Sequence, residues 1–132
     1  MLQRLLPFLL FLLIGHSAMA QRLYDGAGRY MGRFDAGRYY DEAGRFKGRV
    51  DNDRFYDDAG RFKGRWDAGR VYDEAGRFRG RMDKGRAYDA AGRFLGRVDQ
   101  GRLYDEAGRY MGRLDPADER YAALWYFFSV WR

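Results

Sequence analysis

The stretch RFYDDAGRFKGRWDAG, residues 54–69, decides the fold, because the chain repeats it with few changes every sixteen residues. The following unit reads RVYDEAGRFRGRMDKG, and six such units run without a gap from residue 22 to residue 117. A fixed short period is typical of a repeat architecture. We number each unit from position 1 to position 16, so that position 1 is Arg22, Arg38, Arg54, Arg70, Arg86 and Arg102.

Several positions hold the same residue type in all six units. Position 3 is Tyr, position 4 is Asp, positions 7 and 11 are Gly, position 9 is Tyr or Phe, and position 13 is apolar. Two segments of each unit, positions 4–8 and positions 14–16 with the Arg that follows, have the composition of hairpin turns. We interpret both as three-residue loops, a type I turn followed by a residue in the left-handed region. Loops this short join antiparallel strands, which predicts an all-β meander of up to twelve short strands.

The alternation of side chains along a strand then assigns the two faces of the sheet. With three-residue loops at both ends, we expect Tyr56 opposite Phe62 of its own unit and opposite Gly48 of the preceding unit, on an apolar face shared with position 13. The other face is expected to pair Asp57 with Arg61 and to carry positions 2, 10 and 12. A sheet with one apolar face must bury it, which favours a closed or radially symmetric array.

Composition limits the chemistry of this single-domain chain of 132 residues. It contains no Cys, its one His is His16, and Ser129 is the one Ser or Thr after residue 20, so Ser–His, Cys–His and zinc sites cannot form there. The aspartates lie beside arginines, which argues against calcium. We therefore predict a non-enzymatic protein without metal or cofactor. The net charge of +6 suits an anionic partner, although alternating Arg and Asp also neutralise one another locally.

Residues 1–20 have the pattern of a secretory signal peptide. Arg4 precedes an apolar run that ends at Ile14, and Ala18-Met19-Ala20 forms a small-x-small cleavage site before Gln21. The run is shorter than the roughly 20 apolar residues of a membrane-spanning helix. We expect a mature chain, without a transmembrane span, that is periplasmic, on the cell surface or secreted, where nucleic acid is an improbable partner.

The repeat domain, residues 21–117, is followed by a different segment, residues 118–132. Asp115 before Pro116 is expected to cap a short helix, and the run from Tyr121 to Trp131 is almost wholly apolar. An apolar helix is normally buried, so we expect this tail to plug or cover the apolar face of the β array. Docking on a membrane surface or on a partner, and addition of a β-strand, are the alternatives.

Position 12 is the candidate binding site, because its arginines lack an obvious partner: position 2 of the next unit is apolar. Six equivalent guanidinium groups on one face could hold phosphate, sulfate or carboxylate groups in a bidentate manner. The alternative is that they pair with neighbouring Asp and stack on Tyr. The residues are Arg33, Arg49, Arg65, Arg81, Arg97 and Arg113.

The string YDxxGxxxGRxDxGRxYD resembles the repeats of the bacterial 4-fold beta flower family, small proteins whose biochemical role is not established. The resemblance covers all six units and implies a radially symmetric arrangement of β-hairpins, although six units depart from a fourfold pattern. A weaker resemblance, through Tyr-Asp-x-x-Gly-Arg, is to the YD repeats of Rhs-type proteins.

Two functions follow from these observations. The first is an exported, non-enzymatic structural or interaction scaffold. The second is a binding module for an anionic envelope polysaccharide or lipid head group, acting through the position-12 arginines. Homo-oligomerisation is compatible with both functions.

Overall fold

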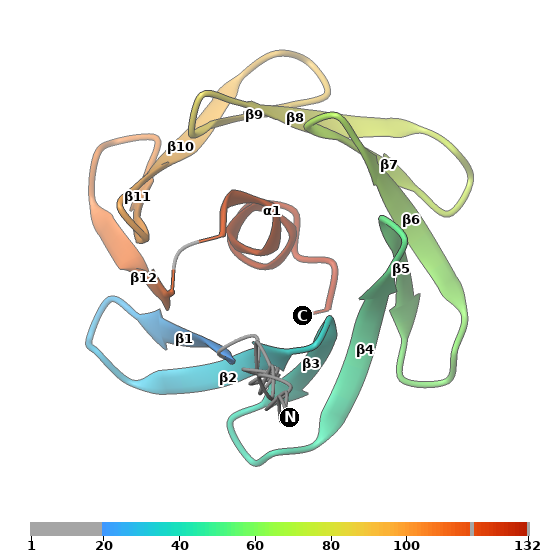
Figure 1. Cartoon of the computed structure of the whole chain (residues 1–132). Helices are drawn as coiled ribbons and strands as arrows, with labels where there is room; N and C mark the ends of the chain where they lie inside the picture. The colour runs from blue at the N-terminus through green and yellow to red at the C-terminus, as the bar shows by residue number, and fades with distance from the viewer. Residues whose placement is uncertain (1–19, 117, 132) are drawn as a thin grey trace, which may run out of the picture.

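The computed structural model describes residues 20–116 and 118–131, so the predicted signal peptide lies almost entirely outside the described residues. Twelve antiparallel strands follow one another around a closed barrel, and β1 pairs with β12 to complete the ring (Figure 1). The prediction of an all-β array of hairpin repeats with a short C-terminal helix is confirmed. The strands are β1 Gln21–Asp25, β2 Tyr30–Asp35, β3 Arg38–Asp41, β4 Phe46–Asp51, β5 Arg54–Asp57, β6 Phe62–Asp67, β7 Arg70–Asp73, β8 Phe78–Asp83, β9 Arg86–Asp89, β10 Phe94–Asp99, β11 Arg102–Asp105 and β12 Tyr110–Asp115.

The turn at positions 4–8 is the predicted three-residue loop. In the third unit Gly60 N–H donates to the Asp57 carbonyl and Asp57 N–H donates to the Arg61 carbonyl, while Gly60 has a φ of +80°. The Asp57 carboxylate accepts from the backbone N–H groups of Ala59 and Arg61, both at 2.9 Å, and from the Arg61 guanidinium at 2.9 Å. The predicted pairing of Asp57 with Arg61 is therefore confirmed, and the other five units repeat it at 2.9–3.2 Å.

The second turn differs from the prediction, because its loop contains two residues instead of three. Asp67 pairs with Arg70, which leaves Ala68 and Gly69 as the loop, with φ of +47° and +89°. Two successive positive φ values are typical of a type I′ turn, whose twist matches that of the flanking strands. The sequence concealed this turn because Ala, unlike Asn or Asp, rarely occupies its first position.

A β-bulge in every unit offsets the shorter turn. Within the third unit Phe55 pairs with Gly64 and Tyr56 pairs with Phe62, so Lys63 at position 10 is the extra residue of the bulge. The two changes together keep the same face inward in all units. They differ from the expectation in that position 2 faces the interior and position 3 faces outward. Tyr56 and Phe62 do pair as predicted, with ring centroids 6.0 Å apart, yet they lie on the outer face.

The barrel interior is lined by positions 2, 11 and 13. Position 2, which we predicted on the polar face, is at most 4% exposed in every unit: Leu23, Tyr39, Phe55, Val71, Ala87 and Leu103. Position 11 is glycine because of a close approach between strands. Gly64 has a φ of +142°, and a Cβ at this residue would collide with the Tyr72 carbonyl oxygen of β7.

The tail forms one short helical segment, an α-helical turn α1 at Glu119–Ala122 that continues as a π-helix η1 at Ala123–Phe127. Its N-cap is Asp118, whose carboxylate accepts from the N–H of Arg120 at 2.9 Å, and not Asp115 as predicted. The difference arises because Asp115 is still the last residue of β12, where it pairs with Arg22 of β1.

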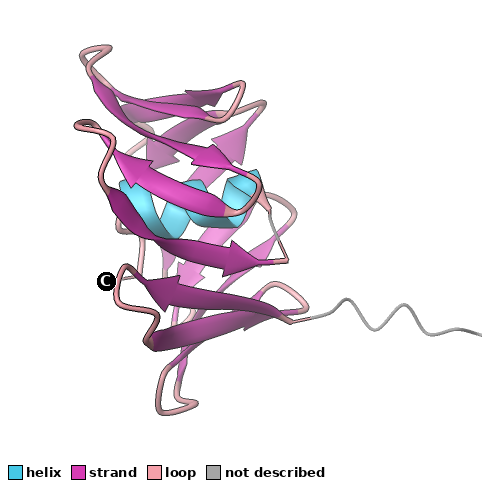
Figure 2. Cartoon of the chain, turned by 90° about the vertical axis from the view of Figure 1, so that its left-hand side faces the viewer, coloured by secondary structure: helices cyan, strands magenta, loops and turns pink. Residues whose placement is uncertain are grey.

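This segment fills the barrel, as the tail-plug prediction required (Figure 2). Leu124 is fully buried, and the indoles of Trp125 and Trp131 are at most 7% exposed. The Tyr126 hydroxyl donates to the Tyr24 carbonyl at 2.6 Å, and Trp131 Nε1 donates to the Tyr56 carbonyl at 3.1 Å. The burial contradicts docking of these side chains on a membrane, and the helical backbone contradicts an added strand.

The first turns should make the protein sensitive to acid. The pKa of Asp57 lies below its ordinary value, mainly because its carboxylate accepts a hydrogen bond from the backbone N–H of Arg61. The N–H of Ala59 and the Arg61 guanidinium lower this pKa further, while partial desolvation raises it. The equivalent aspartates of the other five units show the same lowering of the pKa. A depressed folded-state pKa gives stability that is present above the unfolded pKa of about 4 and is lost as pH falls through the folded value. We expect the urea midpoint to fall steeply below about pH 4.

Asp57→Asn should lower the midpoint at neutral pH and reduce the pH-dependent loss by about a sixth, since it removes one of the equivalent carboxylates. Asp58→Asn is the matched control, because the Asp58 side chain has no hydrogen bond among the described residues and is exposed. An equal effect of the two substitutions on the slope of midpoint against pH would contradict this assignment.

Candidate functional site

The position-12 arginines lie on the outer wall of the barrel, on the second strand of each unit. Each guanidinium stacks over the position-3 tyrosine of the next unit, with its carbon 3.9–4.5 Å from the ring centroid. The last one, Arg113, stacks over Tyr24 and so continues the pattern across the closure of the ring. The structure therefore places the predicted residues in a band around the barrel.

These arginines also have an acidic partner. Arg65 Nη1 lies 3.5 Å from Asp67 Oδ2, and four other units show the same contact at 3.3–3.6 Å. The expectation that position 12 lacks a partner is wrong: the two-residue turn brings the position-3 Tyr, rather than the apolar position 2, opposite it on the next strand, and the Asp lies two residues further along its own strand. The side chains keep 37–44% of their surface exposed, so their outer edges still meet solvent.

The sequence analysis missed the position-1 arginines, which lie directly across the strand pair from position 12. Arg54 is the register partner of Arg65, and the same arginine pair recurs in all six units. All six position-1 side chains are exposed, and none forms an ion pair within the described part of the chain. Like charges placed opposite one another destabilise a sheet, whereas the position-14 Asp that is the other register partner of position 1, as Asp51 is of Arg54, offsets part of this repulsion. The signal that could have revealed it is the presence of Arg at position 1 in every unit.

Two aromatic rings complete an outer groove, defined as positions 1, 3, 9 and 12 of one unit. The position-9 ring is exposed, from 36% at Phe46 to 43% at Tyr110, and contacts the position-3 Tyr at a steep angle. The third and fourth units carry the same residue types at the same register. Surface grooves with these residues in their lining are Arg22, Tyr24, Tyr30 and Arg33; Arg38, Tyr40, Phe46 and Arg49, which Asp57 and Asp58 also border; Arg86, Tyr88, Phe94 and Arg97; and Arg102, Tyr104, Tyr110 and Arg113.

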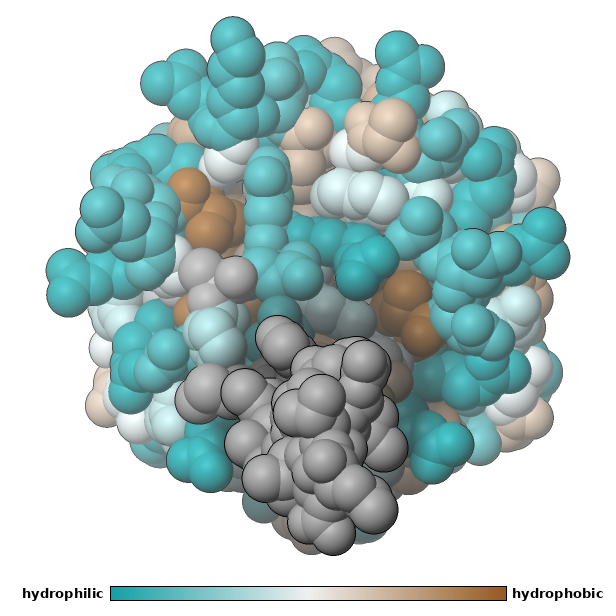
Figure 3. Space-filling view, viewed as in Figure 1, coloured by the Kyte–Doolittle hydropathy of each residue, from teal (hydrophilic) through white to brown (hydrophobic). Residues whose placement is uncertain are grey.

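The outer grooves carry a positive excess. The arginines of position 8 are matched one to one by the aspartates of position 4, whereas two arginines, at positions 1 and 12, face a single aspartate at position 14. Figure 3 looks onto the end of the barrel at the second turns, and hydrophilic residues form most of the rim there. Each groove can therefore offer guanidinium donors to an anionic group, beside aromatic surface for an apolar or sugar face.

Other kinds of site are not apparent in the described residues. No cluster of three or more His, Cys, Asp or Glu side chains is arranged to hold a metal ion within residues 20–116 and 118–131. No helix in this part of the chain is both long enough and apolar enough to cross a membrane.

Comparison with known proteins places the chain by family. Residues 20–129 match the family described as "5-fold beta-flower protein". The resemblance to beta-flower proteins is thus confirmed, but the matching family is described as fivefold and not fourfold. This chain has six units. The resemblance to YD repeats stays a prediction. Searches of curated proteins and of solved structures gave no match.

The two arginines of a groove should differ in their effect on stability. Arg65→Gln removes a cation–π stack and an ion pair, and should cost about 0.5–1 kcal/mol of unfolding free energy. Arg54→Gln removes one of two facing like charges. It should lower the unfolding free energy by about 0.5 kcal/mol at most, or raise it. Urea denaturation measures both variants. A cost for Arg54→Gln as large as that for Arg65→Gln would contradict the assignment of Arg54 as an exposed residue that forms no ion pair among the described residues.

Proposed function

This chain belongs to the 5-fold beta-flower protein family, and we propose that it is an exported, non-enzymatic interaction scaffold whose outer grooves bind an anionic envelope polysaccharide. The observation that carries the proposal is the facing pair of arginines, repeated in all six units with its position-1 member exposed and without an ion pair among the described residues. A planar guanidinium on an aromatic wall suits carboxylate, sulfate or phosphate groups.

The arrangement of the grooves favours a polymer over a lipid surface. The grooves surround the barrel wall, so a flat membrane could meet only those on one side, whereas a flexible chain could contact several in turn. Linked contacts raise the effective concentration for each further one, which compensates for weak individual sites. Aromatic rings at positions 3 and 9 add apolar surface for sugar rings. Anionic lipid head groups offer the same charges and are the alternative source.

We infer that the grooves have no enzymatic activity from the residues that line them. They contain Arg, Tyr and Phe, and the chain after residue 20 has no His or Cys that could serve as base or nucleophile beside them. Their repetition also suits binding better than catalysis, because one ligand can use all units at once.

Binding can be tested on beads that carry polygalacturonate, with dextran beads and anionic lipid vesicles as the other arms. We expect retention on polygalacturonate at low salt and release as salt rises. Replacing Arg54, Arg70 and Arg86 by Gln should weaken binding about tenfold, from three exposed contacts of about 0.5 kcal/mol each. The control variant replaces Arg61, Arg77 and Arg93 of position 8 by Gln, which removes the same three positive charges outside the grooves.

Equal losses from the two triple variants would show that net charge alone governs binding and would contradict the groove assignment. No retention at low salt would overturn the polysaccharide proposal, as would binding to vesicles alone. Circular dichroism of each variant checks that the barrel is intact.

Export can be tested separately through the intact mass of the protein. The pattern Ala18-Met19-Ala20 predicts a mature chain that begins at Gln21. After expression in a bacterium, the periplasmic fraction should contain this species. A cytoplasmic protein that keeps residues 1–20 would contradict export, whatever the result of the binding experiment.

A further inference from the structure

The second turn that follows the second unit differs from the equivalent turns at its last loop residue. The loops at residues 36–37, 68–69, 84–85 and 100–101 all end in glycine, whereas the loop Asn52-Asp53 ends in aspartate. The four glycines have φ values between +79° and +89°, and Asp53 keeps this left-handed conformation with a φ of +63°. Aspartate is therefore the exception at a position where the repeat otherwise uses glycine.

The neighbouring strand disfavours a side chain at this position. At Gly69, the equivalent residue of the next unit, an added Cβ would lie 2.7 Å from the Met82 carbonyl oxygen. The corresponding distances at Gly37 and Gly85 are 2.7 and 2.8 Å. A residue with a Cβ is also less stable than glycine at positive φ. Asp53 is thus a strained residue, and such residues persist where the surrounding structure holds them.

The contact that holds Asp53 comes from the plug, residues 118–131. Arg120 Nη1 donates to Asp53 Oδ1 at 2.7 Å, the shortest ion pair among the described residues. The Arg120 side chain is 34% exposed and that of Asp53 is 51% exposed, so solvent screens the pair only in part. Arg120 Nε is buried without a hydrogen-bond partner in the described part of the chain, where Asp53 is the one ion-pair partner of this guanidinium.

The preceding residue of the plug binds another loop of the same rim. Glu119 Oε1 accepts a hydrogen bond from the Gly85 N–H at 3.0 Å. Gly85 ends the loop that lies two units beyond Asp53 in the repeat. Two consecutive residues of α1 therefore attach the plug to two separate loops at the end of the barrel that carries the second turns.

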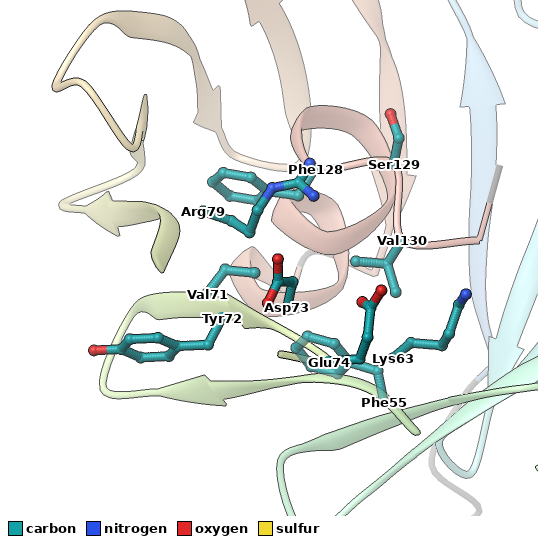
Figure 4. Close-up of a pocket in the computed structure, with 10 residues that line it drawn as sticks. All are labelled: Phe55, Lys63, Val71, Tyr72, Asp73, Glu74, Arg79, Phe128, Ser129 and Val130. Carbon is teal, nitrogen blue, oxygen red and sulfur yellow. The ribbon is translucent and has the colours of Figure 1, made fainter. Parts of the chain in front are cut away.

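The opposite end of the plug has no such attachment. Three plug residues and two charged wall residues border a hollow of about 300 Å³ there (Figure 4): Phe128, Ser129, Val130, Lys63 and Glu74. Within residues 20–116 and 118–131, no ion pair or side-chain hydrogen bond joins these three plug residues to the wall. Attachment through charged side chains is thus confined, in this part of the chain, to the end with the second turns.

We propose that the Asn52-Asp53 loop is a latch that couples the rim of the barrel to the plug. Asp53 holds a conformation that is unfavourable for its own loop, and the ion pair with Arg120 stabilises that conformation while the plug is inserted. Withdrawal of the first turn of the plug leaves the strain of the loop without compensation, so that the loop and the plug change state together. Asp53 is accordingly a positioning residue for the plug, and this role is independent of the outer grooves.

A double-mutant cycle in the otherwise unchanged protein tests the latch by urea denaturation. Asp53→Gly introduces the residue of the other loops, and Arg120→Gln removes the ion pair. Alone, Asp53→Gly should increase the equilibrium constant of unfolding about threefold, because the loss of the ion pair exceeds the relief of strain. Combined with Arg120→Gln, the same substitution should decrease this constant about threefold, because only the relief of strain remains.

Gln100→Gly is the matched control for the relief of strain. Gln100 is an exposed loop residue of another second turn, with a φ of +50°, and it has no hydrogen bond or ion pair with the plug among the described residues. Its replacement should change the equilibrium constant of unfolding by the same factor with and without Arg120→Gln.

Hydrogen exchange tests the coupling at the loop itself. The Trp66 N–H donates to the Asp53 carbonyl at 2.8 Å. In the next unit the Met82 N–H donates to the Gly69 carbonyl at 2.7 Å, which provides an equivalent amide without a latch. Arg120→Gln should accelerate native-state exchange of the Trp66 amide about fivefold, because the loop loses the contact that holds it, and should leave the Met82 amide unchanged.

Three outcomes would overturn the proposal. An effect of Asp53→Gly in the same direction with and without Arg120→Gln would show that the strain and the ion pair are unconnected. A dependence of Gln100→Gly on Arg120 as large as that of Asp53→Gly would assign the effect to general stability. Equal acceleration of the Trp66 and Met82 amides would show that Arg120 stabilises the whole barrel and not this loop.

Discussion

Every unit of this barrel must return its apolar side chains to the same interior, and strand periodicity makes this a strict requirement. A shift of one residue in register moves a whole strand's side chains to the other face. The structure meets the requirement with two changes per unit, a two-residue turn after position 14 and a bulge at position 10. Either change alone would alternate the faces, and together they keep positions 2, 11 and 13 inward in all six units.

The closed wall depends in turn on what fills it. The C-terminal segment completes the interior that the twelve strands enclose, and it supplies Leu124, Trp125 and Trp131 to that space. Its hydrogen bonds to the Tyr24 and Tyr56 carbonyls connect the plug to the first and third units. A single helical segment has no sixfold symmetry, so equivalent wall positions acquire different surroundings.

The outer wall keeps the repetition at the positions that line the grooves. Position 12 stacks on the next tyrosine in every unit, and position 1 faces position 12 in every unit. Each groove is therefore a copy of the others, which suits a ligand that is itself repetitive.

The sequence by itself determined the repeat, the antiparallel hairpins, the first turn with its Asp57–Arg61 contact, and the burial of an apolar tail, because these depend on contacts within a few residues or on composition. It did not determine which face of each strand is buried. That depended on an Ala-Gly loop adopting positive φ at both residues and on a bulge at Lys63, neither of which has a distinct local signature. The partners of Arg65 and the position of Arg54 opposite it follow from register and closure, which only the tertiary structure decided.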